Sequence, residues 1–215
     1  MNHRLPKLPS ESTYRVEDHQ IPVEGGEVTI RCLTPTPAGA PKDQTFPLFF
    51  WAHGGGWVTC NLDLDDFLLR RVCVELQISV VNIDCRLAPQ YRWPTGLNDC
   101  YDGLKWVASH PEVLSASLKK GFIIGGQSAG ANYTAAMALR ARDDPFFEGR
   151  RITGQLLQAV HVIHAEAYPD KYKDQLLSME QNKNMPVLDR SSLDDFYSTS
   201  APVQAIDPLT IFARA

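Results

Sequence analysis

The sequence predicts an α/β fold in which helices cover both faces of a mostly parallel sheet. Short segments made almost entirely of apolar residues alternate along the chain with segments whose apolar residues recur at helical spacing. Strands that are apolar on both sides are typical of parallel sheets buried between two layers of helices. A chain of 215 residues is long enough to bury a core of its own, so we expect one domain over residues 1–215.

The expected strands are short runs rich in β-branched and aromatic residues, each bounded by turn-forming residues. They fall at residues 27–33, 48–53, 78–85, 121–126 and 151–163. The expected helices lie between them, at residues 65–76, 94–110 and 128–142.

Each expected helix carries a signal of its own. In the first, an apolar residue recurs every four positions, at Leu64, Leu68, Val72 and Leu76. Asp63, Asp65 and Asp66 at its start look like an N-cap cluster, and acidic residues there suit the helix dipole. In the second, one face carries Leu97, Tyr101 and Leu104, and the third is rich in alanine. Beyond about residue 165, residues 167–181 and 191–204 look like short amphipathic helices, either plain surface helices or a lid over the strand ends.

Composition excludes several classes of function. The net charge of −4 and the pI near 5.8 argue against a broad nucleic-acid surface, and no apolar run is long enough to cross a membrane. Residues 1–15 contain no apolar core of a secretory signal. The five cysteines are odd in number and form no C-x-x-C pair, so we expect reduced thiols in the cytoplasm.

Ser128 is the candidate nucleophile. Residues 126–130 read Gly-Gln-Ser-Ala-Gly, which matches G-x-S-x-G, and they lie between an expected strand and an expected helix. Gly126 and Gly130 permit the sharp turn that would lift the serine hydroxyl above the sheet. The backbone N–H of Ala129, at the helix start, would then help to hold an oxyanion.

A second motif, independent of the first, directly follows an expected strand. Residues 53–57 read His-Gly-Gly-Gly-Trp, and bare glycine N–H groups can approach a tetrahedral oxygen closely. The alternative is a tight glycine turn with no chemical role. We interpret His53 as an anchor of this loop rather than as a base.

Three stretches together resemble the hormone-sensitive-lipase-like branch of the α/β-hydrolase esterases. They are residues 53–58 (HGGGWV), 84–107 (DCRLAPQYRWPTGLNDCYDGLKWV) and 125–132 (GGQSAGAN). The middle stretch is the most specific, because it matches the R-L-A-P-E segment of the family and the helix that carries Pro94, Asp99 and Trp106. Gln127 stands where the family often has Asp or Glu.

The resemblance implies a fold, an activity and a site. It implies an α/β-hydrolase sheet, lid-like segments at about residues 1–20 and 165–205, and hydrolysis of a small-molecule carboxylic ester, with secondary metabolism as one setting for that activity. It makes Ser128 the nucleophile and assigns the oxyanion hole to the N–H groups of Gly54, Gly55 and Ala129. Trp57 and Tyr133 are candidates to line the pocket, or else plain core. No cofactor is implied.

The triad acid and histidine are not identified. The family places an Asp after strand seven and a His after strand eight. After Ser128 the chain holds only His161 and His164, on or just after the strand expected at 151–163, and Asp207 falls by order in the stretch leading into strand seven. We therefore expect the sheet to stop after strand six, with strands seven and eight absent. The apolar edge left by that strand would favour self-association.

A metal site is not expected. On a strand, His161 and His164 would point to opposite faces and could not share an ion. Besides an ester hydrolase, two alternatives remain open: a catalytically impaired or non-hydrolytic homologue that binds a ligand in the same pocket, and an inactive product of a longer esterase gene. No Walker-type G-K-[ST] follows residues 125–132, which disfavours phosphate binding there.

Overall fold

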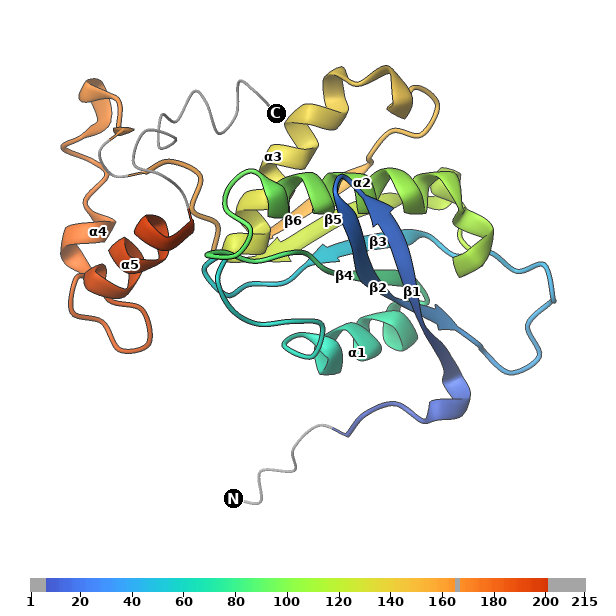
Figure 1. The fold of residues 1–215 in the computed structure, drawn as a ribbon. Coiled ribbons are helices and arrows are strands. Elements are labelled where there is room, and N and C mark those ends of the chain that lie inside the picture. Colours follow the sequence, from blue (N-terminus) through green and yellow to red (C-terminus); the bar gives the residue numbers. More distant parts are fainter. Residues whose placement is uncertain (1–6, 165–166, 201–215) are drawn as a thin grey trace, which may run out of the picture.

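The structure, a computed structural model, describes residues 7–164 and 167–200 (Figure 1). Six strands form one sheet in the order β1-β2-β4-β3-β5-β6. The strands are β1 (Tyr14–Val23), β2 (Gly26–Pro35), β3 (Leu48–Ala52), β4 (Ser79–Asp84), β5 (Phe122–Gln127) and β6 (Gly154–Gln158). β4, β3, β5 and β6 run parallel, whereas β1 and β2 are antiparallel to their neighbours. The predicted α/β class and mostly parallel sheet are confirmed.

Helices cover both faces of the sheet, as expected. One face carries α1 (Asp66–Leu76), and the other carries α2 (Thr95–Ser109) and α3 (Ala129–Asp143) (Figure 1). Two short helices, α4 (Ser178–Gln181) and α5 (Arg190–Ser200), lie beyond one end of the sheet. Single 3-10 turns occur at Glu11–Thr13, Pro111–Leu114, Leu118–Lys120, Pro145–Phe147 and Asp170–Tyr172.

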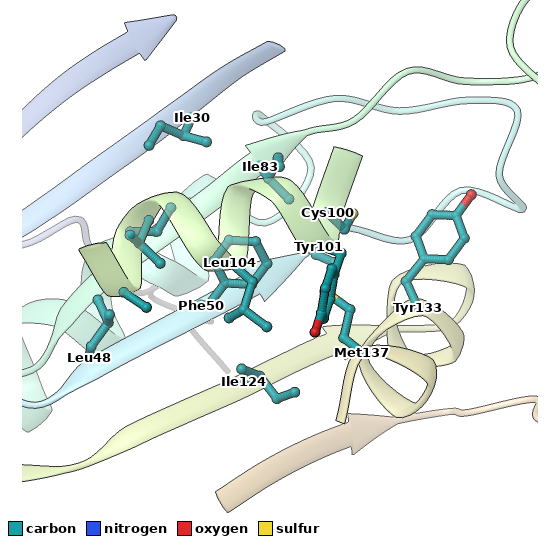
Figure 2. Packing of buried hydrophobic residues seen from close by; sticks show 14 of the residues in the cluster. Ile30, Leu48, Phe50, Ile83, Cys100, Tyr101, Leu104, Ile124, Tyr133 and Met137 are labelled. Atoms are coloured by element: carbon teal, nitrogen blue, oxygen red, sulfur yellow. The ribbon is translucent and has the colours of Figure 1, made fainter. Parts of the chain in front are cut away.

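The alternation of side chains along β3 explains the two layers. Phe49 and Trp51 belong to the apolar cluster beneath α1, whereas Phe50 belongs to the larger cluster beneath α2 and α3. In that larger cluster Leu104 of α2 lies against Phe50 (Figure 2). Both residues are fully buried, and burying side chains of this size contributes about 1.5–3 kcal/mol each.

Three expectations about elements need correction. The first strand, β1, was not expected, because its sequence is largely polar; it is an edge strand that pairs with β2 along its whole length. Residues 14–20, which the resemblance places in a lid-like segment, therefore belong to the sheet. The strand expected at 151–163 is only Gly154–Gln158, so the histidines that follow lie in a loop. On α1 the buried residues are Leu69 and Cys73, whereas Leu68 and Leu76, and Leu64 just before the helix, are exposed.

The aspartates before α1 also differ from expectation, since none of them caps the helix through its side chain. The carboxylate of Asp65 accepts a hydrogen bond from the indole N–H of buried Trp51 at 2.7 Å. Asp63 and Asp66 instead accept from the guanidinium of Arg31 on β2. These contacts tie the segment after the glycine-rich loop to the sheet, a role that spacing along the helix does not reveal.

Candidate active site

Ser128 occupies a sharp turn between β5 and α3. Its backbone has φ 51° and ψ −115°, a positive-φ conformation that a non-glycine residue adopts at a cost of about 1–3 kcal/mol. The strand ends at Gln127 and the helix begins at Ala129, so the predicted strand–turn–helix arrangement is confirmed. The serine is only half-buried, which leaves it accessible.

The glycines of this motif are required by close packing. A Cβ atom on Gly130 would lie 2.0 Å from the carbonyl oxygen of Ala52, at the end of β3. A Cβ atom on Gly126 would lie 2.4 Å from the carbonyl carbon of Gly130. Contacts this short are not tolerated, so glycine at both positions lets the start of α3 lie directly on the neighbouring strand end.

The glycine loop, residues 53–57, contacts the serine turn, as the sequence predicts. A Cβ atom on Gly54 would lie 3.6 Å from the Cβ of Ser128 and 3.2 Å from the carbonyl oxygen of Gln127. Gly55 has φ +119°, a conformation that favours glycine. The structure therefore brings together the loop, Ser128 and the N-terminus of α3, where the helix dipole favours negative charge.

His53 holds the glycine loop in place through a hydrogen bond to its backbone. Its side chain is buried, and its Nδ1 lies 2.7 Å from the carbonyl oxygen of Gly54, to which it donates. Burial lowers the pKa of this imidazole, but the neighbouring Cys85 thiol and the Gly54 carbonyl outweigh that effect and raise the pKa overall. This geometry agrees with the interpretation of His53 as an anchor.

The stretch at residues 84–107 contains an ion pair that holds the loop following β4. The Asp99 carboxylate, buried on α2, accepts from Nε and Nη2 of Arg86 at 2.9 and 2.6 Å and from the Arg86 backbone N–H at 2.9 Å. Hydrogen bonding to Asp99 raises the pKa of the Arg86 guanidinium. This bidentate pair fixes the chain on its way from β4 to α2.

Helix α5 covers the glycine loop with two aromatic side chains, which the sequence did not single out. A Cβ atom on Gly56 would lie 2.5–2.7 Å from three atoms of the Phe196 ring. The rings of Trp57 and Tyr197 lie 5.3 Å apart. The backbone N–H of Trp93 donates to the carbonyl oxygen of Ser200 at 3.0 Å, which ties the end of α5 to the loop before α2.

His161 and His164 lie near the same aromatic cluster rather than on opposite faces of a strand. The hydroxyl of Tyr197 hydrogen-bonds to Nδ1 of His161, and the Tyr197 ring lies 4.5 Å from that of His164. Asn132 on α3 donates to the carbonyl oxygen of His161 at 2.9 Å. Burial, and to a lesser degree His164, lower the pKa of His161. Within residues 7–164 and 167–200 no group of three or more His, Cys, Asp or Glu side chains could hold a metal ion.

The two candidate pocket residues differ in their surroundings. Trp57 is half-buried beside Tyr197. Tyr133 is buried in the core between α3 and α2, and its hydroxyl oxygen lies 2.6 Å from where a Cβ atom on Gly96 would be (Figure 2 shows the ring beside Cys100). Asp207 lies outside the described residues.

A serine on a strained strand-to-helix turn, placed against a glycine-rich loop, defines the α/β-hydrolase class. The sequence model of the alpha/beta hydrolase fold family matches residues 49–213, and the chain belongs to this family, in its hormone-sensitive-lipase-like branch. No helix among the described residues is both long and apolar enough for a membrane span.

Relatives and solved structures support this placement. Esterase LipI of Mycobacterium tuberculosis is 33% identical over 89% of this chain and 56% of its own length. The versiconal hemiacetal acetate esterase of Dothistroma septosporum is 33% identical over 76% of this chain and 49% of its own. The crystal structure of vibralactone cyclase is 43% identical with a TM-score of 0.89, covering 94% of this chain and 60% of that one. The chain spans about half the length of the two esterases.

Proposed function

We propose that this chain acts on a small-molecule carboxylic ester as a hydrolase of the hormone-sensitive-lipase-like type. The observation that carries the proposal is the strained backbone of Ser128 at the end of β5, in contact with the glycine loop. Ser128 is the nucleophile of this proposal. The backbone N–H groups of Gly54, Gly55 and Ala129 are the oxyanion donors.

In the proposed reaction the Ser128 Oγ attacks the ester carbonyl carbon, and the carbonyl oxygen becomes negative. Fixed N–H groups stabilise that charge more in the transition state than in the bound substrate, which is what accelerates the step. The alcohol leaves with a proton, and water then releases the acid from the acyl-serine. A serine hydroxyl is a weak nucleophile unless a base takes its proton.

No base is assigned among the described residues, so we expect a low rate of ester hydrolysis. Without one, oxyanion stabilisation and binding give about 10³–10⁴-fold acceleration over water, far below an intact triad. We therefore propose that this chain alone hydrolyses activated esters slowly. A further proposal is that a partner chain supplies the base, or that His161 or His164 does.

The substrate class, pathway and location belong to the same proposal. A role in secondary metabolism is supported by the likeness to versiconal hemiacetal acetate esterase. A cytoplasmic location is supported by the five cysteines, all of which are free thiols.

The test is hydrolysis of p-nitrophenyl acetate by the purified chain and by its Ser128→Ala variant. We expect slow turnover that falls only modestly in the variant. Addition of a candidate partner would raise turnover if the base comes in trans, whereas loss of the residual rate in His161→Ala or His164→Ala would point to those residues. Turnover above about 1 s⁻¹ that vanishes in Ser128→Ala would contradict the proposed lack of a base.

A second candidate function is intramolecular ring closure, and the likeness to vibralactone cyclase favours it. In that case a hydroxyl of the substrate, rather than water, attacks the acyl-serine carbonyl. Its proton passes to the Ser128 oxygen as the acyl–serine bond breaks, so a lactone leaves and the serine is restored. Mass spectrometry of the products of a hydroxy-ester distinguishes the two, because a lactone is one water lighter than the hydroxy-acid.

A further inference from the structure

The contact between α5 and the glycine loop is made by two consecutive residues on each side. Phe196 lies directly on Gly56, and Tyr197 lies beside Trp57 with the rings tilted by 39°. A side chain at position 56 would overlap the Phe196 ring, so the glycine there makes room for α5. Three aromatic residues, Trp57, Phe196 and Tyr197, therefore gather at the glycine loop, and all three are only partly buried.

This aromatic surface adjoins the proposed oxyanion donors. Gly56 and Trp57 directly follow Gly54 and Gly55 in the chain, and Gly54 is in contact with Ser128. The aromatic residues therefore lie on the part of the loop that directly follows the proposed donors. A substituent of an ester whose carbonyl is held by Gly54 and Gly55 can reach these rings.

The polar groups of this surface are already occupied or neutral. The Tyr197 hydroxyl is bonded to His161, so it faces its partner rather than a ligand. Burial raises the pKa of Tyr197 and lowers that of His161, which keeps both side chains uncharged near neutral pH. A charged substituent would lose its hydration here without gaining an ion pair from these rings.

We propose that Phe196 and Tyr197, together with Trp57, form the wall that determines substrate specificity, and that they select neutral esters bearing an aryl or other flat unsaturated ring over flexible alkyl esters. The inference rests on the proposed function, because it takes the ester carbonyl to bind at Gly54 and Gly55. Flat rings bury a large area on aromatic side chains and lose little conformational entropy, whereas an alkyl chain must be immobilised.

Binding to the Ser128→Ala chain tests the wall without requiring catalysis. Dissociation constants for 2-naphthyl acetate and hexyl acetate are measured by calorimetry, since the two esters share the acetyl group and differ in the alcohol part. We expect the naphthyl ester to bind about tenfold more tightly. Phe196→Ala should remove most of that preference and Phe196→Leu part of it, while Tyr197→Phe, which keeps the ring, should retain it. Phe67→Leu, at an exposed position of α1, is the matched control and should leave both constants unchanged.

Two results would overturn the proposal. One is equal affinity for the two esters, and the other is a preference that Phe196→Ala and Phe196→Leu both leave intact in variants whose circular dichroism is native. Covalent labelling of the wild-type chain at Ser128 reports the proposed function separately. A labelled chain without the preference would refute the wall alone, whereas a chain with the preference but no labelling would refute the nucleophile alone.

Discussion

Gly54 lies so close to Ser128 that a Cβ atom added to the glycine would be in van der Waals contact, 3.6 Å from the Cβ of Ser128. The two segments belong to different strand ends, β3 and β5, which are adjacent and parallel in the sheet. Parallel pairing places the carboxyl ends of both strands at one edge, and this is what brings the donors of one motif to the nucleophile of the other.

Gly54→Ala should impair the site while sparing the fold. The added methyl would lie 3.2 Å from the carbonyl oxygen of Gln127, so the loop and the serine turn must separate by a few tenths of an ångström, which misplaces the oxyanion donors. Loss of one well-placed oxyanion donor costs about 10²–10³-fold in rate. The rate of Ser128 labelling by a fluorophosphonate should therefore fall at least tenfold. Gly154→Ala, where the nearest atom is 3.8 Å away, is the control, and equal rates in both variants would refute the prediction.

Asp99→Asn should destabilise the chain by about 3 kcal/mol, because it leaves the Arg86 guanidinium without its buried carboxylate. The change is measured as the free energy of unfolding in urea. Asp143→Asn removes an exposed ion pair with Arg142 and should change that free energy little. Similar decreases in the free energy of unfolding for the two variants would contradict the claim that the buried pair stabilises the chain more than the exposed one.

Stability should decline in acid partly through His161. Its pKa is lower in the folded chain than in the unfolded chain, so the unfolded state binds more protons at low pH. The stabilisation is present above the ordinary histidine pKa of about 6.5 and is lost as the pH falls through the folded value. Urea midpoints at about pH 7.5 and about pH 5 should differ less in His161→Gln than in the wild-type chain. An unchanged difference would argue against this assignment.

The chain should self-associate through β6. Within the described residues β6 pairs only with β5, and Leu156 on it is 52% exposed. Unpaired apolar strand edges favour pairing with another chain. Light scattering after gel filtration should show higher-order species that Leu156→Lys reduces. Leu76→Lys, at an exposed leucine on α1, should not reduce them, and a clean wild-type monomer at high concentration would count against the prediction.

The parts of the fold that the sequence predicts are those set by local pattern. The strands that contain Phe50 and Ile124 are apolar on both faces. The turn at Ser128 is predicted by the glycines on either side of it. β1 is not predicted because only two of its ten side chains, Tyr14 and Ile21, are buried, so its sequence lacks a regular apolar pattern, whereas its whole length pairs with β2. Leu68 and Leu76 of α1, and Leu64 just before it, have helical spacing yet are exposed, because Leu69 and Cys73 form the face that packs on the sheet.

The site was predictable to the extent that it is carried by contiguous motifs. Ser128 and Gly54 follow from their motifs, and their contact follows from the parallel order of the strands. The contact of Phe196 with Gly56 joins segments far apart in the chain, and only the docking of α5 creates it. The only signal in the sequence for this contact is the pair Phe196 and Tyr197 on an expected amphipathic helix, and that pair does not indicate which segment the helix packs against.

The central claim, that Ser128 is built as a nucleophile, is tested most directly by mass spectrometry of the chain after treatment with a fluorophosphonate probe. The strained turn and the adjacent glycine loop predict a single adduct, located on the peptide that contains Ser128 and absent from Ser128→Ala. The adduct should form slowly, because no base is assigned to take the serine proton. No adduct on native chain, or an adduct that forms equally on other serines and persists in Ser128→Ala, would contradict the claim.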